Sequence, residues 1–310
     1  MSLPNIKNRL RSGFGFAGLF FAVFFLAPDG YLPFALAGLA AVIALEFYQM
    51  TSAAGIPNFD RCGTGAVVLL VAVTWASGVL QGEEAEGTWD AVAMFLVTAG
   101  VFLRQFPQKD NPTPLRTIGG TLFGVLYVGL LWNFLTKLVL FGRPEGVAWL
   151  WTREGIWWPG RWLLMYTLFA SKFTDVGAYL TGCSIGKHKL CPRISPKKTW
   201  EGVAGGVLFS TLLGTLLVWA VNRWGDPAQH GVAQFGLTTW RAVPLGLALG
   251  GCAVLGDLTE SLFKRASGLK DSASVLPGMG GLLDVLDSVL FTAPAMYLFV
   301  RLAGLFGLGA

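Results

Sequence analysis

The sequence predicts an all-α, polytopic integral membrane protein. Of its 310 residues, 54% are hydrophobic and only 13% are charged. A soluble domain carries about 25% charged residues, so this chain has too few to cover a water-facing surface. Apolar runs of near-membrane length recur along the chain, and no stretch is polar enough to form a separate soluble domain. The modest net charge of +5 concerns membrane orientation and does not indicate nucleic-acid binding.

About nine apolar segments are long enough, or nearly so, to cross a bilayer. They lie at 14–27, 31–50, 65–81, 89–103, 118–141, 162–180, 203–221, 243–260 and 285–306. The first segment resembles a signal peptide, but no A-x-A cleavage site follows it, so we expect a retained helix. We divide the chain into N-terminal transmembrane helices, 1–160, and a C-terminal transmembrane region, 161–310, that carries two long polar loops.

The basic residues fall mostly on one side of the predicted membrane. With nine spans, the N-terminus, Arg61 and the loops 104–117, 181–201 and 261–284 share one side and hold 15 Lys and Arg residues, against five in the loops of the other side. Positive residues mark the cytoplasmic face. We therefore expect a multi-pass protein of the cytoplasmic (inner) membrane, with its N-terminus and both polar loops in the cytoplasm.

The first polar loop follows a span that itself contains charged residues. Lys172 and Asp175 are three apart, so they share a helix face and can pair. Ionisable groups at membrane depth are costly and indicate function, with a structural ion pair at the helix end as the alternative. Two cations and two hydroxyls come next, in the segment SPKKTWEG: Ser195, Lys197, Lys198 and Thr199. Such a set suits a phosphate chain, whereas an ordinary positive-inside loop would explain only the lysines.

The second polar loop reads GDLTESLFKRASGLKDSASVLPGMGGLLDVLD. Asp257, Glu260 and Ser261 fall on about one helical turn, and Asp284 and Asp287 are spaced to face one way on the next helix. Glycines at 278–281 permit positive φ and a close approach of ligand to backbone. Carboxylates from two helix ends suit Mg²⁺, which prefers oxygen ligands and often binds through carboxylates and substrate phosphates.

Cations accompany these carboxylates and would neutralise phosphate charge: Lys264, Arg265 and Lys270. Together the two loops predict metal-assisted phosphoryl or nucleotidyl transfer at the cytoplasmic face. The pair Cys183 and Cys191 around His188 is spaced too widely for a zinc site, so we expect reduced cysteines.

The second loop resembles the C-terminal signature of the phosphatidate cytidylyltransferase (CDP-diacylglycerol synthase) family, roughly S-x-x-K-R-x4-K-D-x5-P-G-H-G-G-x-x-D-R-x-D. The segment TDVGAYLTGCSIGKHKLCPRISPKKTWEG resembles a second block of that family. Both blocks lie in the C-terminal region, which the resemblance makes catalytic, while residues 1–160 match only as a run of hydrophobic spans. The sequence departs from the signature at Met279, where the family has His, and at Val285, where it has Arg.

The resemblance implies the reaction of CTP with phosphatidate to give CDP-diacylglycerol and pyrophosphate, dependent on Mg²⁺. It implies that the metal ligands are Asp257, Asp284 and Asp287. With these three aspartates, the expected catalytic residues are Lys270 and Asp271, the latter as a further member of the signature. From the residue patterns and the signature together, the expected substrate-binding residues are Asp175, Ser195, Lys197, Lys198, Thr199, Ser261, Lys264 and Arg265. Many relatives are dimers, so a homodimer is an open expectation. The metal carboxylates all remain, so we expect an active enzyme.

Three other functions stay open at this point. A lipid or polyprenol kinase would use the same loops with ATP, since nothing in the residues selects the base. A paralogue with an altered substrate would explain Met279 and Val285. An ion-coupled transporter would need charged groups near the middle of several spans, whereas spans one to five hold little beyond Glu46 and Lys137.

Overall fold

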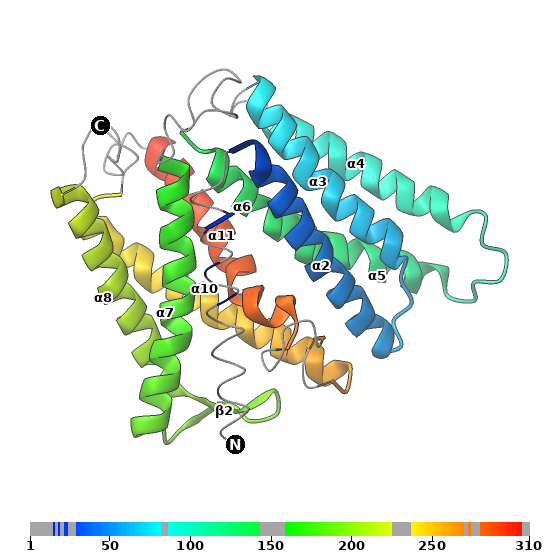
Figure 1. The fold of residues 1–310 in the computed structure, drawn as a ribbon. Helices are drawn as coiled ribbons and strands as arrows, with labels where there is room; N and C mark the ends of the chain where they lie inside the picture. Colours follow the sequence, from blue (N-terminus) through cyan, green and yellow to red (C-terminus); the bar gives the residue numbers. More distant parts are fainter. Residues whose placement is uncertain are drawn as a thin grey trace. The chain divides into compact units, whose positions relative to one another are not determined.

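The computed structural model describes residues 15, 18, 22–23, 29–81, 86–142, 159–224, 237–269, 272–273 and 280–305. The described residues are almost entirely helical (Figure 1), which confirms the predicted all-α membrane fold. The helices are η2 (Asp29–Tyr31), α2 (Leu32–Ala53), α3 (Asp60–Gln81), α4 (Glu86–Gln105), α5 (Pro114–Gly124), η4 (Val125–Leu130), α6 (Leu131–Leu140), α7 (Pro159–Ile185), α8 (Trp200–Trp224), α10 (Thr239–Ala266) and α11 (Leu282–Leu305). A two-stranded hairpin, β1 (Lys189–Cys191) and β2 (Ser195–Thr199), is the only sheet among these residues.

Seven helical stretches in the described part of the chain are long and apolar enough to cross a membrane. They are Leu32–Ala53, Asp60–Leu80, Gly87–Gln105, Pro114–Leu140, Trp200–Arg223, Thr239–Ala266 and Leu282–Ala303. Each corresponds to a predicted span. The predicted span 162–180 is also helical, as α7, but its polar residues keep it out of this group. The first predicted span, 14–27, lies mostly outside the described residues, so nine spans are not confirmed.

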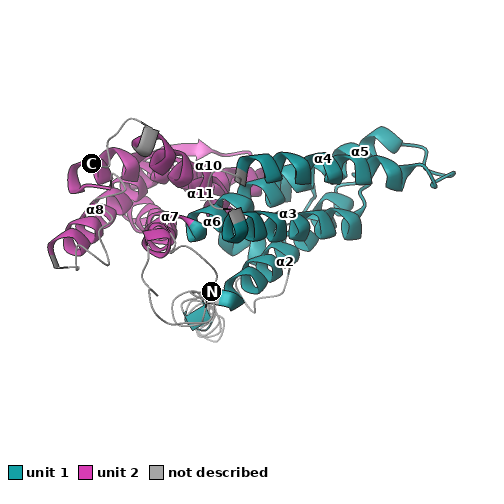
Figure 2. Ribbon diagram, turned by 90° about the horizontal axis from the view of Figure 1, so that it is seen from above, with its two compact units in different colours: residues 1–140, 145–156, 263–286 teal, residues 141–144, 157–262, 287–310 magenta. Residues whose placement is uncertain are grey.

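The described helices form two compact units (Figure 2): one from residues 1–140, 145–156 and 263–286, and one from 141–144, 157–262 and 287–310. Residues 263–286 therefore pack with the N-terminal helices, and α10 and α11 each contribute residues to both units. The functional division predicted at residue 160 stays a prediction. The two units are described separately below.

In the first unit, Tyr48 of α2 is held between glycines of two neighbouring helices. A Cβ at Gly63 or Gly124 would lie within 2.4 Å of the Tyr48 ring, so only glycine leaves room for it. The Tyr48 hydroxyl donates to the Thr121 carbonyl at 2.8 Å, and Trp132 Nε1 donates to the Leu36 carbonyl at 3.1 Å. These contacts connect α2 with the long helical stretch α5–η4–α6, which contains one π-helical segment.

A buried polar network joins three helices of the same unit. Asp90 of α4 pairs with Lys137 of α6, and it accepts a hydrogen bond from Thr74 of α3 at 2.5 Å. Asn133 donates to Thr74 Oγ1 at 2.7 Å. Polar side chains inside a membrane bundle need such partners, because hydrocarbon offers none. The network therefore satisfies groups that would otherwise oppose insertion.

In the second unit, α7 and α8 pack closely through small residues. A Cβ at Gly206 would lie 2.6 Å from the Thr174 carbonyl oxygen, and one at Gly177 would lie 2.7 Å from Phe209 Cβ. Helix α10 approaches α8 in the same way, since a Cβ at Gly246 would lie 2.8 Å from Thr211 Cα. Small residues at such crossings are typical of membrane helices, which associate through close backbone packing.

Candidate active site

The predicted site residues are divided between the two units. In the second unit, the β-hairpin carries four of them, Ser195, Lys197, Lys198 and Thr199. Its strands are antiparallel, with Lys189 opposite Thr199 and Cys191 opposite Ser195. Thr199 is buried and precedes α8, where its Oγ1 accepts a hydrogen bond from the Gly202 amide at 3.1 Å. This is the contact of a helix N-cap. Thr199 thus connects the hairpin to the start of α8. This structural role is separate from its predicted contact with phosphate.

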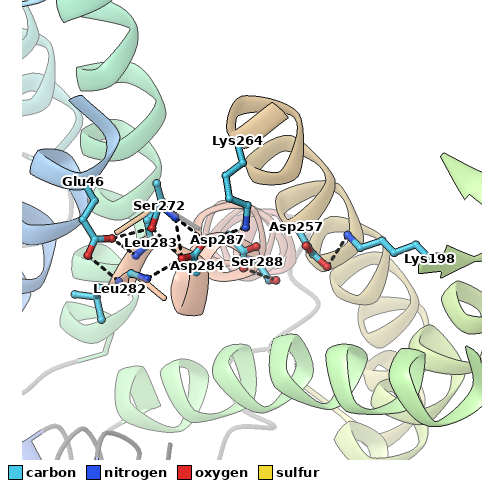
Figure 3. Close-up of polar contacts among 11 residues, drawn as sticks. Glu46, Lys198, Asp257, Lys264, Ser272, Leu282, Leu283, Asp284, Asp287 and Ser288 are labelled. Carbon is cyan, nitrogen blue, oxygen red and sulfur yellow. Dashed lines mark hydrogen bonds and ion pairs between the residues drawn. The ribbon is translucent and has the colours of Figure 1, made fainter. Parts of the chain in front are cut away.

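The hairpin presents its two lysines differently. Lys197 is exposed, whereas Lys198 is half-buried and its Nζ lies 2.6 Å from Asp257 Oδ2 of α10 (Figure 3). The structure therefore brings together a predicted phosphate ligand and a predicted metal ligand. No local sequence pattern indicates this pair, because about 60 residues separate its members.

Three carboxylates of the second unit come from three helices: Asp175 of α7, Asp257 of α10 and Asp287 of α11. Lys172 donates to Asp175 at 3.2 Å, as their spacing predicted. Asp287 is 4% exposed, and its Oδ1 accepts hydrogen bonds from the amide and hydroxyl of Ser288. All three carboxylates belong to the second unit.

Gly256 lets α10 approach α11 beside two of these carboxylates. A Cβ on Gly256 would lie 2.6 Å from the Asp287 carbonyl oxygen and 2.8 Å from Ser288 Cα. Any side chain here would push the helices apart. The glycine directly before Asp257 therefore sets the separation of the helices that carry Asp257 and Asp287.

In the first unit, Asp284 lies in the first turn of α11, and both of its carboxylate oxygens accept hydrogen bonds. Its Oδ1 accepts a hydrogen bond from Lys264 Nζ at 2.8 Å. Its Oδ2 accepts from the Gly281 amide at 2.7 Å, from the Ser272 amide at 3.0 Å and from the Ser272 hydroxyl at 3.1 Å. Lys264 and Asp284 are 16% and 9% exposed. Asp284 thus joins the end of α10 to the start of α11.

Glu46 of α2 is a member of this cluster that sequence reasoning missed. It is 3% exposed, and it accepts hydrogen bonds from the amides of Leu282 and Leu283 and from the Ser272 hydroxyl (Figure 3). In the sequence, Glu46 stands out only as one of two isolated charges in the early spans. The signal that could have found it is a carboxylate in the middle of an apolar helix, which indicates function by default.

The other predicted residues have less defined surroundings. Ser195 and Ser261 are half-buried, and Arg265 is exposed near the end of α10. Lys270, Asp271 and Met279 lie outside the described residues, as does part of the 278–281 glycine elbow. Within that elbow, Gly280 has φ +94°, as predicted for a position that needs glycine. The four cysteines are free, and His188 contacts Glu201, with 2.5 Å between Nδ1 and Oε1.

The carboxylate oxygens are the type of donor that a hard divalent cation prefers, but they do not form a preformed coordination site. Within the part of the chain that the structure describes, no three His, Cys, Asp or Glu side chains form a group that could hold a metal. The carboxylates of Asp175, Asp257 and Asp287 still provide oxygen atoms alone, the donors that Mg²⁺ prefers. Asp175 and Asp257 are neutralised by lysine partners. A divalent ion could take the place of these lysines beside the carboxylates, and the lysines could then pair with substrate phosphates.

These features define a class of protein: a polytopic membrane protein whose helix ends gather carboxylates and lysines. Comparison with known proteins narrows the class. Residues 7–303 match the cytidylyltransferase family, and the chain belongs to that family.

Curated relatives cover most of the chain. A phosphatidate cytidylyltransferase of Synechocystis sp. is 32% identical over 281 residues, covering 86% of this chain and 88% of the relative. One of Pseudomonas aeruginosa is 35% identical over 260 residues, covering 77% and 87%. One of Chlamydia pneumoniae is 32% identical over 277 residues, covering 87% and 82%.

Proposed function

We propose that this protein transfers the cytidylyl group of CTP to phosphatidate, giving CDP-diacylglycerol and pyrophosphate for phospholipid biosynthesis. The observation that carries the proposal is the family match over residues 7–303, together with relatives that cover 77–87% of the chain and are named phosphatidate cytidylyltransferase. The membrane fold supports it, because one substrate is a lipid and the other is soluble in water.

The reaction joins two phosphates that repel one another. An oxygen of the phosphatidate phosphate attacks the α-phosphorus of CTP, the bond to the β-phosphate breaks, and pyrophosphate leaves. A phosphate monoester has a second pKa of about 6, so the nucleophile is already mostly ionised at pH 7 and needs little help from a base. The demand on the protein is therefore positioning and neutralisation of charge.

Lysine side chains beside carboxylates meet that demand. Lys198 of β2, paired with Asp257, and Lys264 near the end of α10, paired with Asp284, are held in place by these ion pairs. Each lysine can exchange part of its contact for substrate phosphate. Each unit also has an exposed cation that can add positive charge for CTP: Lys197 in the second unit and Arg265 in the first. In the first unit, Lys264 and Arg265 offset the absence of the family's arginine at position 285.

Mg²⁺ belongs to the proposal as its cofactor. Asp257 and Asp287, with Asp175 nearby, are the residues of the second unit that would hold it, and Asp284 is the candidate in the first unit. The ion would neutralise the phosphate charge of CTP. We further propose that these groups face the cytoplasm, since the 15 basic residues of one set of loops mark that side.

The test is an assay of the purified protein in detergent with labelled CTP, dioleoyl phosphatidate and Mg²⁺. We expect CDP-diacylglycerol to form, to disappear with EDTA and to return with added Mg²⁺. Asp287→Asn and Asp284→Asn should each lose at least about a hundredfold in kcat, the scale of a lost electrostatic or positioning contact. Asp110→Asn, which changes an exposed carboxylate in the 106–113 loop, is the matched control and should retain activity.

The alternatives give different products. A lipid kinase would transfer the γ-phosphate of ATP and release no pyrophosphate. An altered-substrate paralogue would use CTP with another lipid phosphate. If folded protein forms no product with any of these nucleotides and lipids, the proposal is wrong, and ion flux in vesicles becomes the next measurement.

A further inference from the structure

Helix α11 begins without a cap of its own. Its first helical residue is Leu282, so Gly281 is in the N-cap position. An N-cap side chain normally accepts a hydrogen bond from the first turn, where four backbone N–H groups lack partners inside the helix. Glycine has no side chain to do this. The start of α11 therefore depends on acceptors from elsewhere.

Glu46 supplies the missing acceptor from a helix that lies 236 residues earlier in the sequence. Its Oε1 accepts from the Leu282 amide at 2.9 Å, and its Oε2 accepts from the Leu283 amide at 2.7 Å. A carboxylate is favoured at this end of a helix, where the backbone carries partial positive charge. The contact also explains the burial of Glu46, because a buried carboxylate is tolerated when its oxygens are paired.

Asp284 completes the arrangement from inside α11. Its side chain reaches back to the Gly281 amide, as the third helical residue does in a capping box. Glu46 takes the other half of that motif, which an N-cap side chain would normally provide. The Ser272 hydroxyl lies between the two carboxylates, 3.2 Å from Glu46 Oε2 and 3.1 Å from Asp284 Oδ2.

A side chain at position 281 would have to displace the side chains of Glu46 and Ser272. A Cβ at Gly281 would lie 2.4 Å from Glu46 Oε2 and 2.1 Å from Ser272 Oγ. Gly281 and Glu46 together therefore form the N-cap of α11, with the acceptor side chain supplied by α2. The carboxylate also occupies a place where helix N-termini otherwise bind phosphate. These two amides of α11 are therefore not available to a substrate phosphate.

We propose that Glu46 is a positioning residue for nucleotidyl transfer: it fixes the start of α11 and, through Ser272, the orientation of the Asp284 carboxylate. The proposal rests on the proposed function for its kinetic consequence. Both carboxylate oxygens of Glu46 accept hydrogen bonds from the protein, so we assign Glu46 a role through α11 and none in direct contact with substrate. Its loss should lower turnover more than CTP binding, because the reacting groups would still be present but misplaced.

The first measurement is hydrogen exchange of the α11 start, which needs no substrate. Glu46→Gln should speed exchange of the Leu282 and Leu283 amides about tenfold or more, the scale of a lost hydrogen bond to a charged group. Thr51→Ala is the matched control. It removes another buried polar side chain of α2, whose hydroxyl contacts Tyr48 and Asn58, and it should leave these amides unchanged.

The second measurement separates kcat from KM, with turnover expressed per folded molecule after size exclusion. Glu46→Gln should lower kcat about 10- to 100-fold and change the KM for CTP less than about threefold. Glu46→Asp keeps the charge and should recover part of the loss. It also serves as the test variant if Glu46→Gln does not fold.

Unchanged exchange in folded Glu46→Gln would overturn the capping role. Faster exchange with wild-type kcat would overturn the positioning role and leave Glu46 with a structural role alone. A wild-type protein that makes no CDP-diacylglycerol would instead count against the proposed function, and the exchange data would still decide whether Glu46 holds α11.

Discussion

The close approach of α10 to α11 at Gly256 makes a single methyl group a sharp probe of the site. Gly256→Ala would place a Cβ 2.6 Å from the Asp287 carbonyl oxygen, where ordinary contacts are 3.4–4 Å. Both obstacles, this oxygen and Ser288 Cα at 2.8 Å, are backbone atoms that no change of rotamer can move. The two helices must therefore separate locally by about 1 Å.

The magnitude follows from two opposing terms. Overpacking costs about 1–3 kcal/mol, and the better helix propensity of alanine returns about 1 kcal/mol. The net loss of stability is therefore about 0–2 kcal/mol, and the protein should still fold. The catalytic loss should be larger, because a displacement of about 1 Å between groups that must act together reduces turnover about a hundredfold.

The assay compares thermal unfolding and CDP-diacylglycerol formation for Gly256→Ala and for Gly251→Ala. Gly251 lies on the same helix, but a Cβ there would meet nothing within 4 Å. We expect the control to be as active as wild type and equally or slightly more stable. Wild-type turnover in Gly256→Ala, or an equal loss in both variants, would refute the idea that Gly256 sets the spacing of the Asp257 and Asp287 carboxylates.

Two further predictions concern the lysines. Lys198→Ala should raise the KM for CTP about 10- to 100-fold, because a charged hydrogen bond to phosphate is lost, and Lys197→Ala should raise it less. Steady-state kinetics at varied CTP measures both values, and an unchanged KM in Lys198→Ala would remove Lys198 from the substrate site. Asp90→Asn should destabilise the protein by about 3 kcal/mol, because it removes the charge beside Lys137, and it should leave kcat unchanged. In thermal unfolding, the double variant Asp90→Asn/Lys137→Gln should recover most of the lost stability. A double variant no more stable than Asp90→Asn would contradict this.

Much of the fold follows from composition and spacing. Apolar runs predicted seven helices that the structure confirms, and the three-residue spacing of Lys172 and Asp175 predicted their ion pair. Helix ends were less predictable. Helix α10 continues to Ala266, whereas the predicted span ends at 260. The prediction ended where the apolar run ends, but the helical backbone hydrogen bonds continue into the polar residues that follow.

The candidate site was predictable in its residue types but not in its pairings. The sequence indicates carboxylates and lysines in two loops, and it does not show that Lys198 meets Asp257 or that Lys264 meets Asp284. Such pairs depend on which helices pack together. Glu46 was missed for the same reason, since its partners on α11 lie more than 230 residues further along the chain.

The split cap of α11 also imposes an order on biosynthesis. Helix α2 is synthesised and inserted long before Leu282 and Leu283 leave the ribosome, because chains are made from the N-terminus. Until then the side chain of Glu46 needs water or another polar partner, since an unpaired charge in hydrocarbon is costly. The early bundle is thus assembled around an unfilled position, and the last described helix completes it. In the newly made protein, a competent site and a finished membrane bundle would then arise in the same folding event.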